Sequence, residues 1–265
     1  ISVSDKNHLS TLLKVLKKFN IKIISSGGTH KKIKTLGYKS VEVSKYTEFP
    51  EILNGRVKTL HPKIYSGILS NRKSKSDYEE IKKYKFNTID LVIVNFYPFE
   101  KTLKYSKNQK KIIENIDIGG PTMARAAAKN YESVSIITSI DDYKYLVKEL
   151  YMYKGGTSLS FRRNMSEKAF LETGCYDSKI SKYFSGISNN SFGNKKIISL
   201  DKIEDLRYGE NPHQNAAIYN IEPFNQKINQ LSGKQLSFNN YNDLYSALSV
   251  SKSLPKNNGT VIVKH

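Results

Sequence analysis

The sequence has no tryptophan and a single cysteine, so an intrachain disulfide is impossible. That cysteine, Cys175, stands in "ETGCYD", within a stretch that favours a helix. We interpret it as a small buried hydrophobe rather than a nucleophile. A chain without disulfides fits a reducing, cytoplasmic compartment, which is where we expect it to work.

Long apolar runs are also missing. None approaches the roughly 18–20 residues that cross a bilayer, and the polar start "ISVSDKNHLS" is unlike a signal peptide. We therefore expect no membrane partner. The chain begins without methionine and ends in the strand-like run "VIVKH", so we expect that both ends are cut.

Acidic residues are scarce: 24 Asp and Glu face 43 Lys and Arg, for a formal charge of +19. Such a charge is typical either of a polyanion-binding protein or of a lysine-rich solvated surface. The lysines are scattered along the chain, and no nucleic-acid motif is visible. We favour the second interpretation, with no nucleic-acid partner and a few cations that bind a phosphorylated small molecule.

Strand-like and helix-like segments alternate over about the first 140 residues, which predicts an α/β fold with a mostly parallel sheet flanked by helices. The expected strands cover residues 1–3, 21–25, 39–44, 89–99 and 133–139, and the expected helices cover 8–20, 27–37, 76–84, 119–130 and 141–150. The continuous apolar run "LVIV" indicates a strand that is covered on both faces. In such sheets, ligands bind beyond the carboxyl ends of the strands.

A second domain is predicted after the long helical stretch at 158–183. The segment "SGISNNSFGN" has the composition of a linker. We place the boundary near 186–196, and we expect domains at 1–190 and 191–265.

Two glycine turns precede predicted helices. Ser26-Gly27-Gly28-Thr29 follows a strand, and Asp117-Ile118-Gly119-Gly120 opens the alanine-rich helix that carries Arg125 and Lys129 on one face. Glycines let a backbone approach an anion, and a helix N-terminus directs free N–H groups at it. An ordinary capped helix start explains the first turn about equally well. For the second turn the alternative is a capped start on a solvated cationic face, but the compact residues Ala126, Ala127 and Ala128 would let this helix approach another element closely.

The segment "GRVKTLHP" concentrates donors in eight residues. Arg56 can bind a phosphate or carboxylate through two nitrogens, and Lys58 can stabilise an oxyanion if it is desolvated. Asn95 and Tyr97 end the strongest strand. Spacing alone does not reject the alternative of a solvated basic loop.

Six motifs together resemble a known family. "ISVSDK", "SSGGT", "GRVKTLHPKIYSGIL", "VNFYPF", "ENIDIGGPTMARAAAKN" and "DLRYGENPHQ" occur in the order found in the bifunctional purine-biosynthesis protein that joins AICAR formyltransferase to IMP cyclohydrolase. The resemblance covers essentially the whole chain. It implies a methylglyoxal-synthase-like cyclohydrolase domain, followed by the start of a cytidine-deaminase-like α/β formyltransferase domain.

The resemblance also implies site residues. For the cyclisation of FAICAR to IMP, which needs no metal or cofactor, the matching catalytic positions are Lys58, Tyr97, Asp117 and Lys129. The matching substrate-binding positions are Ser2, Ser4, Asp5, Lys6, Ser26, Gly27, Gly28, Thr29, Arg56, Val57, Thr59, Val94, Asn95, Ile118, Gly119 and Gly120.

In the second part, the resemblance implies AICAR contacts at Arg207 and Tyr208 and catalytic roles for Lys264 and His265. The family uses 10-formyltetrahydrofolate as formyl donor and works as a homodimer. This chain stops where the family continues for about another domain, so we expect it not to transfer formyl groups. The alternative to a cyclohydrolase is a domain of the same fold that binds a phosphorylated effector without catalysis.

Overall fold

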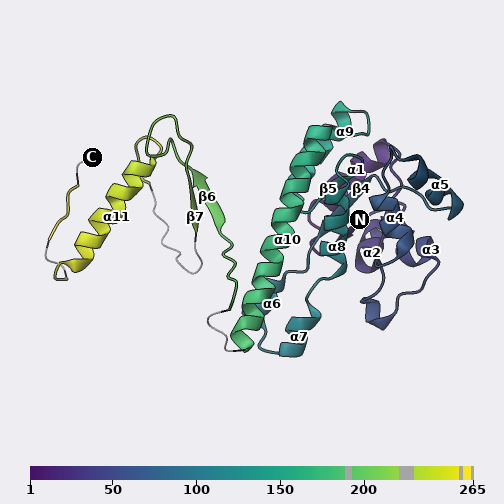
Figure 1. Ribbon diagram of the computed structural model, residues 1–265, viewed down its shortest axis with the longest axis horizontal. Coiled ribbons are helices and arrows are strands. Elements are labelled where there is room, and N and C mark those ends of the chain that lie inside the picture. The colour runs from purple at the N-terminus through teal and green to yellow at the C-terminus, as the bar shows by residue number, and fades with distance from the viewer. Residues whose placement is uncertain (189–192, 221–229, 257–258, 264–265) are drawn as a thin grey trace. The chain divides into compact units, whose positions relative to one another are not determined.

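The protein is described by a computed structural model that covers residues 1–188, 193–220, 230–256 and 259–263 (Figure 1). Contacts divide the chain into two compact units, Ile1–Gly193 and Asn194–His265. Each unit is described below by itself.

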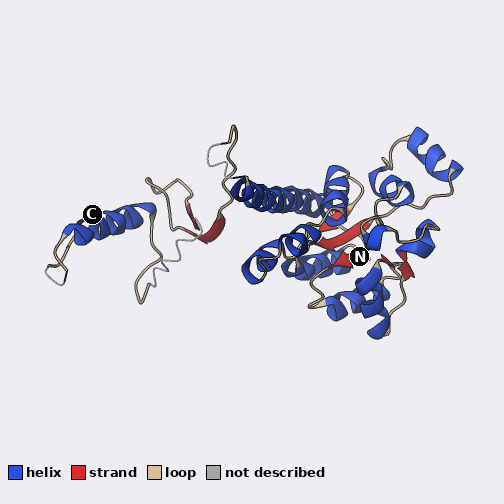
Figure 2. Ribbon diagram, turned by 90° about the horizontal axis from the view of Figure 1, so that it is seen from below, coloured by secondary structure: helices blue, strands red, loops and turns tan. Residues whose placement is uncertain are grey.

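Unit 1 is built on parallel strands, as the alternating pattern predicted (Figure 2). β4 (Leu91–Asn95) lies between β1 (Ser2–Val3) and β5 (Ser135–Ile137), and both neighbours are parallel to it. β2 (Ile24–Ser25) and β3 (Val41–Glu42) form a second parallel pair. The two sheets are joined where the backbone nitrogen of Ile1 donates to the Ile24 carbonyl oxygen at 2.7 Å.

The predicted helices are present. Their bounds are α1 (Leu9–Lys18), α2 (Gly27–Thr35), α5 (Lys75–Lys83), α8 (Gly119–Lys129), α9 (Tyr143–Met152) and α10 (Leu159–Ile187). α8 packs on β4 and β5, and α10 in turn covers α8 and β5 (Figure 1). Cys175 lies in α10 and is half-buried.

The core follows from the apolar spacing. In α1, leucines three and four residues apart form one buried stripe that belongs to the main hydrophobic core. The side chains of Val92, Ile93 and Val94 are all buried, as expected for a strand covered on both faces. The carboxyl end of β4, where Asn95 stands, is therefore held rigidly.

Short elements between the longer ones were not predicted. They are α3 (Val43–Thr47), η1 (Leu53–Gly55), α4 (Pro62–Leu69), α6 (Phe99–Tyr105), α7 (Gln109–Glu114) and η2 (Ile140–Asp142). α4 starts directly after "GRVKTLH", with Pro62 in its first turn and His61 Nδ1 accepting a hydrogen bond from the Lys63 nitrogen at 3.1 Å. Eight residues show too little periodicity to reveal a helix in the sequence.

α4 approaches the segment before β4 closely because of one glycine. A β-carbon on Gly67 would stand 2.5 Å from the Asn87 carbonyl oxygen, which no side chain tolerates. The same end of α4 is also held by Asn130, whose Nδ2 donates to the carbonyl oxygens of Ile68 and Ser70 at 2.7 and 2.9 Å. α4 thereby has a fixed place between β4 and α8.

Unit 2 contains the antiparallel pair β6 (Asp201–Asp205) and β7 (Ala217–Asn220), followed by α11 (Phe238–Ser253). α11 begins at a capping box in which Ser237 and Asn240 each satisfy the other's backbone nitrogen. Among the residues that the structure describes, no helix combines the length and apolarity needed to cross a membrane.

Candidate functional site

The carboxyl ends of β1 and β4 meet, as expected for parallel strands. Asn95 Oδ1 accepts hydrogen bonds from the backbone nitrogens of Ser4 and Asp5 at 2.6 and 2.9 Å, and its Nδ2 donates to the Asp5 carbonyl oxygen at 2.9 Å. Lys6 Nζ donates to the Ser4 carbonyl oxygen at 3.0 Å. The Asn95 side chain thus fixes the turn Ser4–Lys6 at this edge of the sheet.

The glycine turn before α2 is tied to the same edge. Ser26 Oγ lies 3.1 Å from Ser2 Oγ, and the buried Thr29 hydroxyl bonds both the nitrogen and the carbonyl oxygen of Val3 at 3.1 and 3.0 Å. These hydroxyls hold the loop in place. The N–H groups of Gly27 and Gly28 lie in the first turn of α2, where a helix leaves its N–H groups without helical partners.

Lys58 lies over this turn. Its Nζ is 3.5 Å from the point where a β-carbon on Gly27 would stand, and Gly27 has a left-handed φ of 41°. The side chain is half-buried. The Lys58 ammonium also interacts electrostatically with the Asp117 carboxylate. Lys58 therefore links the glycine turn before α2 to the residues before α8.

Asp117 occupies a sheltered position before α8. Burial raises the pKa of its carboxyl, although the N–H groups of Gly120 and Tyr97 and the charge of Lys58 act in the opposite direction. Asp117 Oδ1 accepts from the Gly120 nitrogen at 2.9 Å, which caps the helix. A carboxyl with these partners can orient an amide or accept its proton.

Two further contacts close this region. Thr59 is buried, and its Oγ1 would lie only 2.7 Å from a β-carbon on Gly119. The Tyr97 side chain is 40% exposed. The backbone N–H of the same residue donates a hydrogen bond to the Asp117 carboxylate. The structure thus gathers Lys58, Tyr97 and Asp117 around the start of α8.

Lys129 is not part of this group within one chain. It is exposed at the far end of α8, ten residues after Gly119. At a rise of about 1.5 Å per residue, the two positions are about 15 Å apart. A lysine side chain does not span that distance.

Arg56 is paired rather than open. Its guanidinium binds both carboxylate oxygens of Glu114, with Nε at 3.1 Å from Oε1, and both side chains are exposed. The pair lowers the pKa of Glu114. The preceding residues Leu53, Asn54 and Gly55 all have positive φ, so this loop has an unusual backbone.

Three other predicted contacts differ in accessibility. The Val94 side chain is buried in the core, so only its backbone can face a ligand. Ile118 is 57% exposed, and Val57 is half-buried. Among the described residues, no group of three or more His, Cys, Asp and Glu is placed to hold a metal ion.

In unit 2, Arg207 and Tyr208 are adjacent to each other. The guanidinium carbon lies 4.9 Å from the centre of the Tyr208 ring, and Arg207 donates to the Tyr208 hydroxyl at 3.3 Å. The Ser237 hydroxyl and Arg207 lower the pKa of Tyr208. Lys264 and His265 lie outside the described residues.

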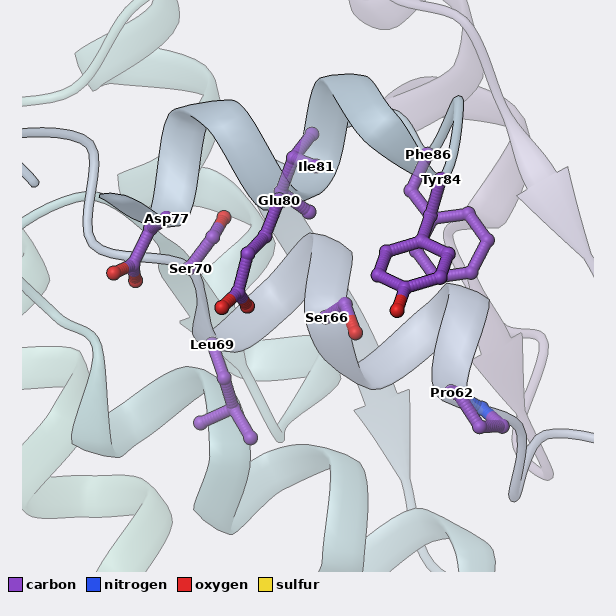
Figure 3. Close-up of a pocket in the computed structure, with 9 residues that line it drawn as sticks. All are labelled: Pro62, Ser66, Leu69, Ser70, Asp77, Glu80, Ile81, Tyr84 and Phe86. Carbon is purple, nitrogen blue, oxygen red and sulfur yellow. The ribbon is translucent and has the colours of Figure 1, made fainter. Parts of the chain in front are cut away.

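A groove of about 400 Å³ lies elsewhere on unit 1, between α4 and α5 (Figure 3). Its lining comes from α4 and Ser70, from α5, and from Tyr84 and Phe86 just after α5; Glu80 and Tyr84 extend toward α4. None of the predicted site residues lines it.

Sequence reasoning missed two residues of the site. Tyr176 on α10 accepts a hydrogen bond from the Asp117 nitrogen at 2.9 Å, across 59 positions of sequence. Glu114 holds Arg56. Tyr176 lies in a stretch that showed only helical character. Glu114 opens the motif "ENIDIGGPTMARAAAKN", but its pairing with Arg56 has no local sequence signal.

Two family models match successive parts of the chain. A family model described as an MGS-like domain matches residues 8–122, and one described as the AICARFT/IMPCHase bienzyme matches residues 127–265. The crystal structure of ForH is similar with a TM-score of 0.62 and 31% identity, covering 69% of this chain and 96% of ForH.

Curated relatives match along the whole chain. The bifunctional purine biosynthesis protein PurH of Clostridioides difficile is 44% identical over 100% of this chain and 52% of its own length. PurH of Bradyrhizobium diazoefficiens is 42% identical over 100% and 51%. The chain spans about half the length of these relatives, and it belongs to the AICARFT/IMPCHase bienzyme family.

Proposed function

We propose that residues 1 to about 190 are an IMP cyclohydrolase domain, which closes the ring of FAICAR to give IMP and water in purine biosynthesis. The printed name of the PurH relatives supports the pathway. The observation that carries the proposal is the place of Lys58, whose ammonium lies over the Gly27 turn and acts on the Asp117 carboxylate. A nucleotide carries its phosphate at one end and its reacting groups at the other. Lys58 lies between the Gly27 turn, which suits the phosphate, and Asp117, which suits the reacting groups.

The ligand is held from its phosphate end. The N-terminus of α2 offers backbone N–H groups and the positive end of the helix dipole to the phosphate. No other side chain crowds Gly28, because nothing lies within 4 Å of a β-carbon placed there. Arg56 adds a second cation once the phosphate competes with Glu114 for it.

The chemistry joins two groups of one molecule. The carboxamide nitrogen attacks the formyl carbon, the new C–N bond forms, and the formyl oxygen takes up one N–H proton. That oxygen then leaves as water with a second N–H proton, and a C=N bond remains. Positioning supplies much of the rate because the reaction is intramolecular.

The side chains divide the remaining work. Asp117 orients the carboxamide and accepts its proton, for which a buried carboxyl of raised pKa is suited. Lys58 and the Tyr97 hydroxyl stabilise the charge that develops on the formyl oxygen. No metal and no organic cofactor takes part in this scheme.

In this proposal, Lys129 takes part in the reaction only at the site of a second copy of the chain. It lies about 15 Å along α8 from Gly119, estimated from the helical rise, so it completes the site of a partner in a homodimer. Mixing inactive Lys58→Ala and Lys129→Ala chains should then restore about a quarter of wild-type activity through heterodimers that keep one intact site. A mixture without activity would contradict a site shared between two chains, and an active Lys129→Ala chain would place Lys129 outside the reaction.

Unit 2 belongs to the second activity in this proposal. In a protein of the relatives' length, Arg207 and Tyr208 bind AICAR, Lys264 and His265 act in formyl transfer, and 10-formyltetrahydrofolate is the co-substrate. Residues 1–265 alone should not form FAICAR from AICAR and this folate. Formation of FAICAR by the purified chain would contradict the assignment.

The test is a spectrophotometric assay of the purified chain with FAICAR. Wild type should form IMP, and Lys58→Ala should lose turnover by orders of magnitude while it stays folded. Lys34→Ala, which removes an exposed cation from α2, is the matched control and should remain active. If wild type binds IMP but does not cyclise FAICAR, the domain is an effector-binding module instead.

A further inference from the structure

A buried tyrosine of α10 connects the two segments that carry Asp117 and Tyr97. Tyr176 is 7% exposed, and its hydroxyl accepts from the Asp117 nitrogen at 2.9 Å while it donates to the Asn115 carbonyl oxygen at 3.4 Å. The hydroxyl thus bonds both ends of the turn Asn115–Asp117. This turn sets the direction in which the Asp117 carboxylate leaves the backbone.

The ring of Tyr176 holds the other segment. It packs edge-on against Phe96 at 5.2 Å and against Phe99 at 6.3 Å, measured between ring centres. These phenylalanines flank Tyr97 and Pro98 in the chain. Tyr176 therefore holds both segments, the one with Asp117 and the one with Tyr97. With Ile112, Phe99 and the partly buried Phe96, it forms a small apolar cluster in addition to the main core.

The protonation state of Tyr176 suits an anchor rather than an acid. Burial raises its pKa to about 12, so the hydroxyl keeps its proton at neutral pH. A neutral hydroxyl can accept from one backbone group and donate to another at once. Tyr176 itself faces the turn rather than a position where substrate would lie.

We propose that Tyr176 is a positioning residue for the cyclisation, which holds the Asp117 carboxylate and the Tyr97 segment in register through its hydroxyl and its ring. This inference rests on the proposed function. It also places a determinant of the site outside residues 8–122, which match the MGS-like model, because α10 lies wholly beyond them.

The experiment compares Tyr176→Phe with Tyr183→Phe. The first removes the hydroxyl and keeps the ring, whereas Tyr183, two turns further along α10, packs against Phe99 at 5.8 Å in the same cluster. Tyr176→Phe should lower kcat by about 10- to 100-fold with little change in KM, because misplacing a reacting group affects the chemical step. Tyr183→Phe should behave like wild type.

A double-mutant cycle separates positioning from general damage. In an Asp117→Asn background, the added Tyr176→Phe change should have no further effect on kcat, because its influence passes through Asp117. A wild-type kcat in Tyr176→Phe, or a loss that multiplies with that of Asp117→Asn, would overturn the inference.

Hydrogen exchange distinguishes failure of the inference about Tyr176 from failure of the proposed cyclohydrolase function. The Asp117 amide should be protected in wild type and in Tyr183→Phe, and it should exchange faster in Tyr176→Phe. If wild type shows no turnover although this pattern holds, the cyclisation is wrong and the positioning role is overturned with it. If protection does not change in Tyr176→Phe, the anchor itself is refuted.

Discussion

Gly120→Ala should damage the site more than the fold. Gly120 is buried in the first turn of α8, and a β-carbon there would stand 2.5 Å from Asp117 Oδ2, 3.0 Å from its Cγ and 3.1 Å from Phe96 Cδ1. An ordinary contact is near 3.5 Å, so the carboxylate must move by about 1 Å. That movement directs Asp117 away from the position in which it caps the helix.

The cost to stability is small by comparison. Overpacking a buried site costs about 1–3 kcal/mol, and replacing a helical glycine by alanine returns about 1 kcal/mol. The free energy of unfolding should therefore fall by about 0–2 kcal/mol on these two terms. A 1 Å displacement of a reacting group can lower turnover by about 100-fold.

Gly174→Ala is the matched control for this variant. Gly174 is exposed in α10, with nothing within 4 Å of an added β-carbon. It should gain about 0.5–1 kcal/mol of stability and keep its activity. Urea unfolding and the FAICAR assay measure both effects. A Gly120→Ala chain as active as wild type would refute the role given to the Asp117 carboxylate.

Three further perturbations test other contacts. Because the pKa of Asp117 is raised, the folded state favours the protonated carboxyl. The free energy of unfolding of wild type should therefore fall relative to that of Asp117→Asn as pH rises from 3.8 through the folded pKa, and the difference between them should be constant above it. Urea unfolding at several pH values measures this difference, and a difference that is constant over the whole pH range would contradict the prediction. Asn130→Ala removes both hydrogen bonds to the end of α4 and should cost about 1–3 kcal/mol, so an unchanged urea midpoint would be inconsistent with that tie. Glu114→Gln should leave Tm unchanged, because its pair with Arg56 is exposed, yet it should tighten IMP binding measured by calorimetry; weaker binding would count against Arg56 as a phosphate ligand.

The sequence predicted the framework of the site well. The apolar run of β4 indicated a buried strand, and the polar residues at the ends of successive strands had to share one edge because the strands are parallel. The contacts between Asn95 and the turn Ser4–Lys6 follow from that rule. Periodicity and topology are properties that a single sequence carries directly.

The hydrogen-bond partners of individual side chains could not be predicted from the sequence in the same way. The Ser26 and Thr29 hydroxyls fit a phosphate by residue type, but the structure uses them to bond Ser2 and Val3. The pair of Arg56 with Glu114 joins residues 58 positions apart, and the Tyr176 bond to Asp117 spans 59. Such contacts depend on how helices pack, which local patterns do not specify.

The most direct test of the central claim is a crystal structure of the chain bound to IMP. The account predicts the phosphate at the Gly27 and Gly28 nitrogens, with the base near Asp117 and the Lys58 ammonium between the two ends. IMP bound in the α4–α5 groove, or with its base remote from Asp117, would contradict it.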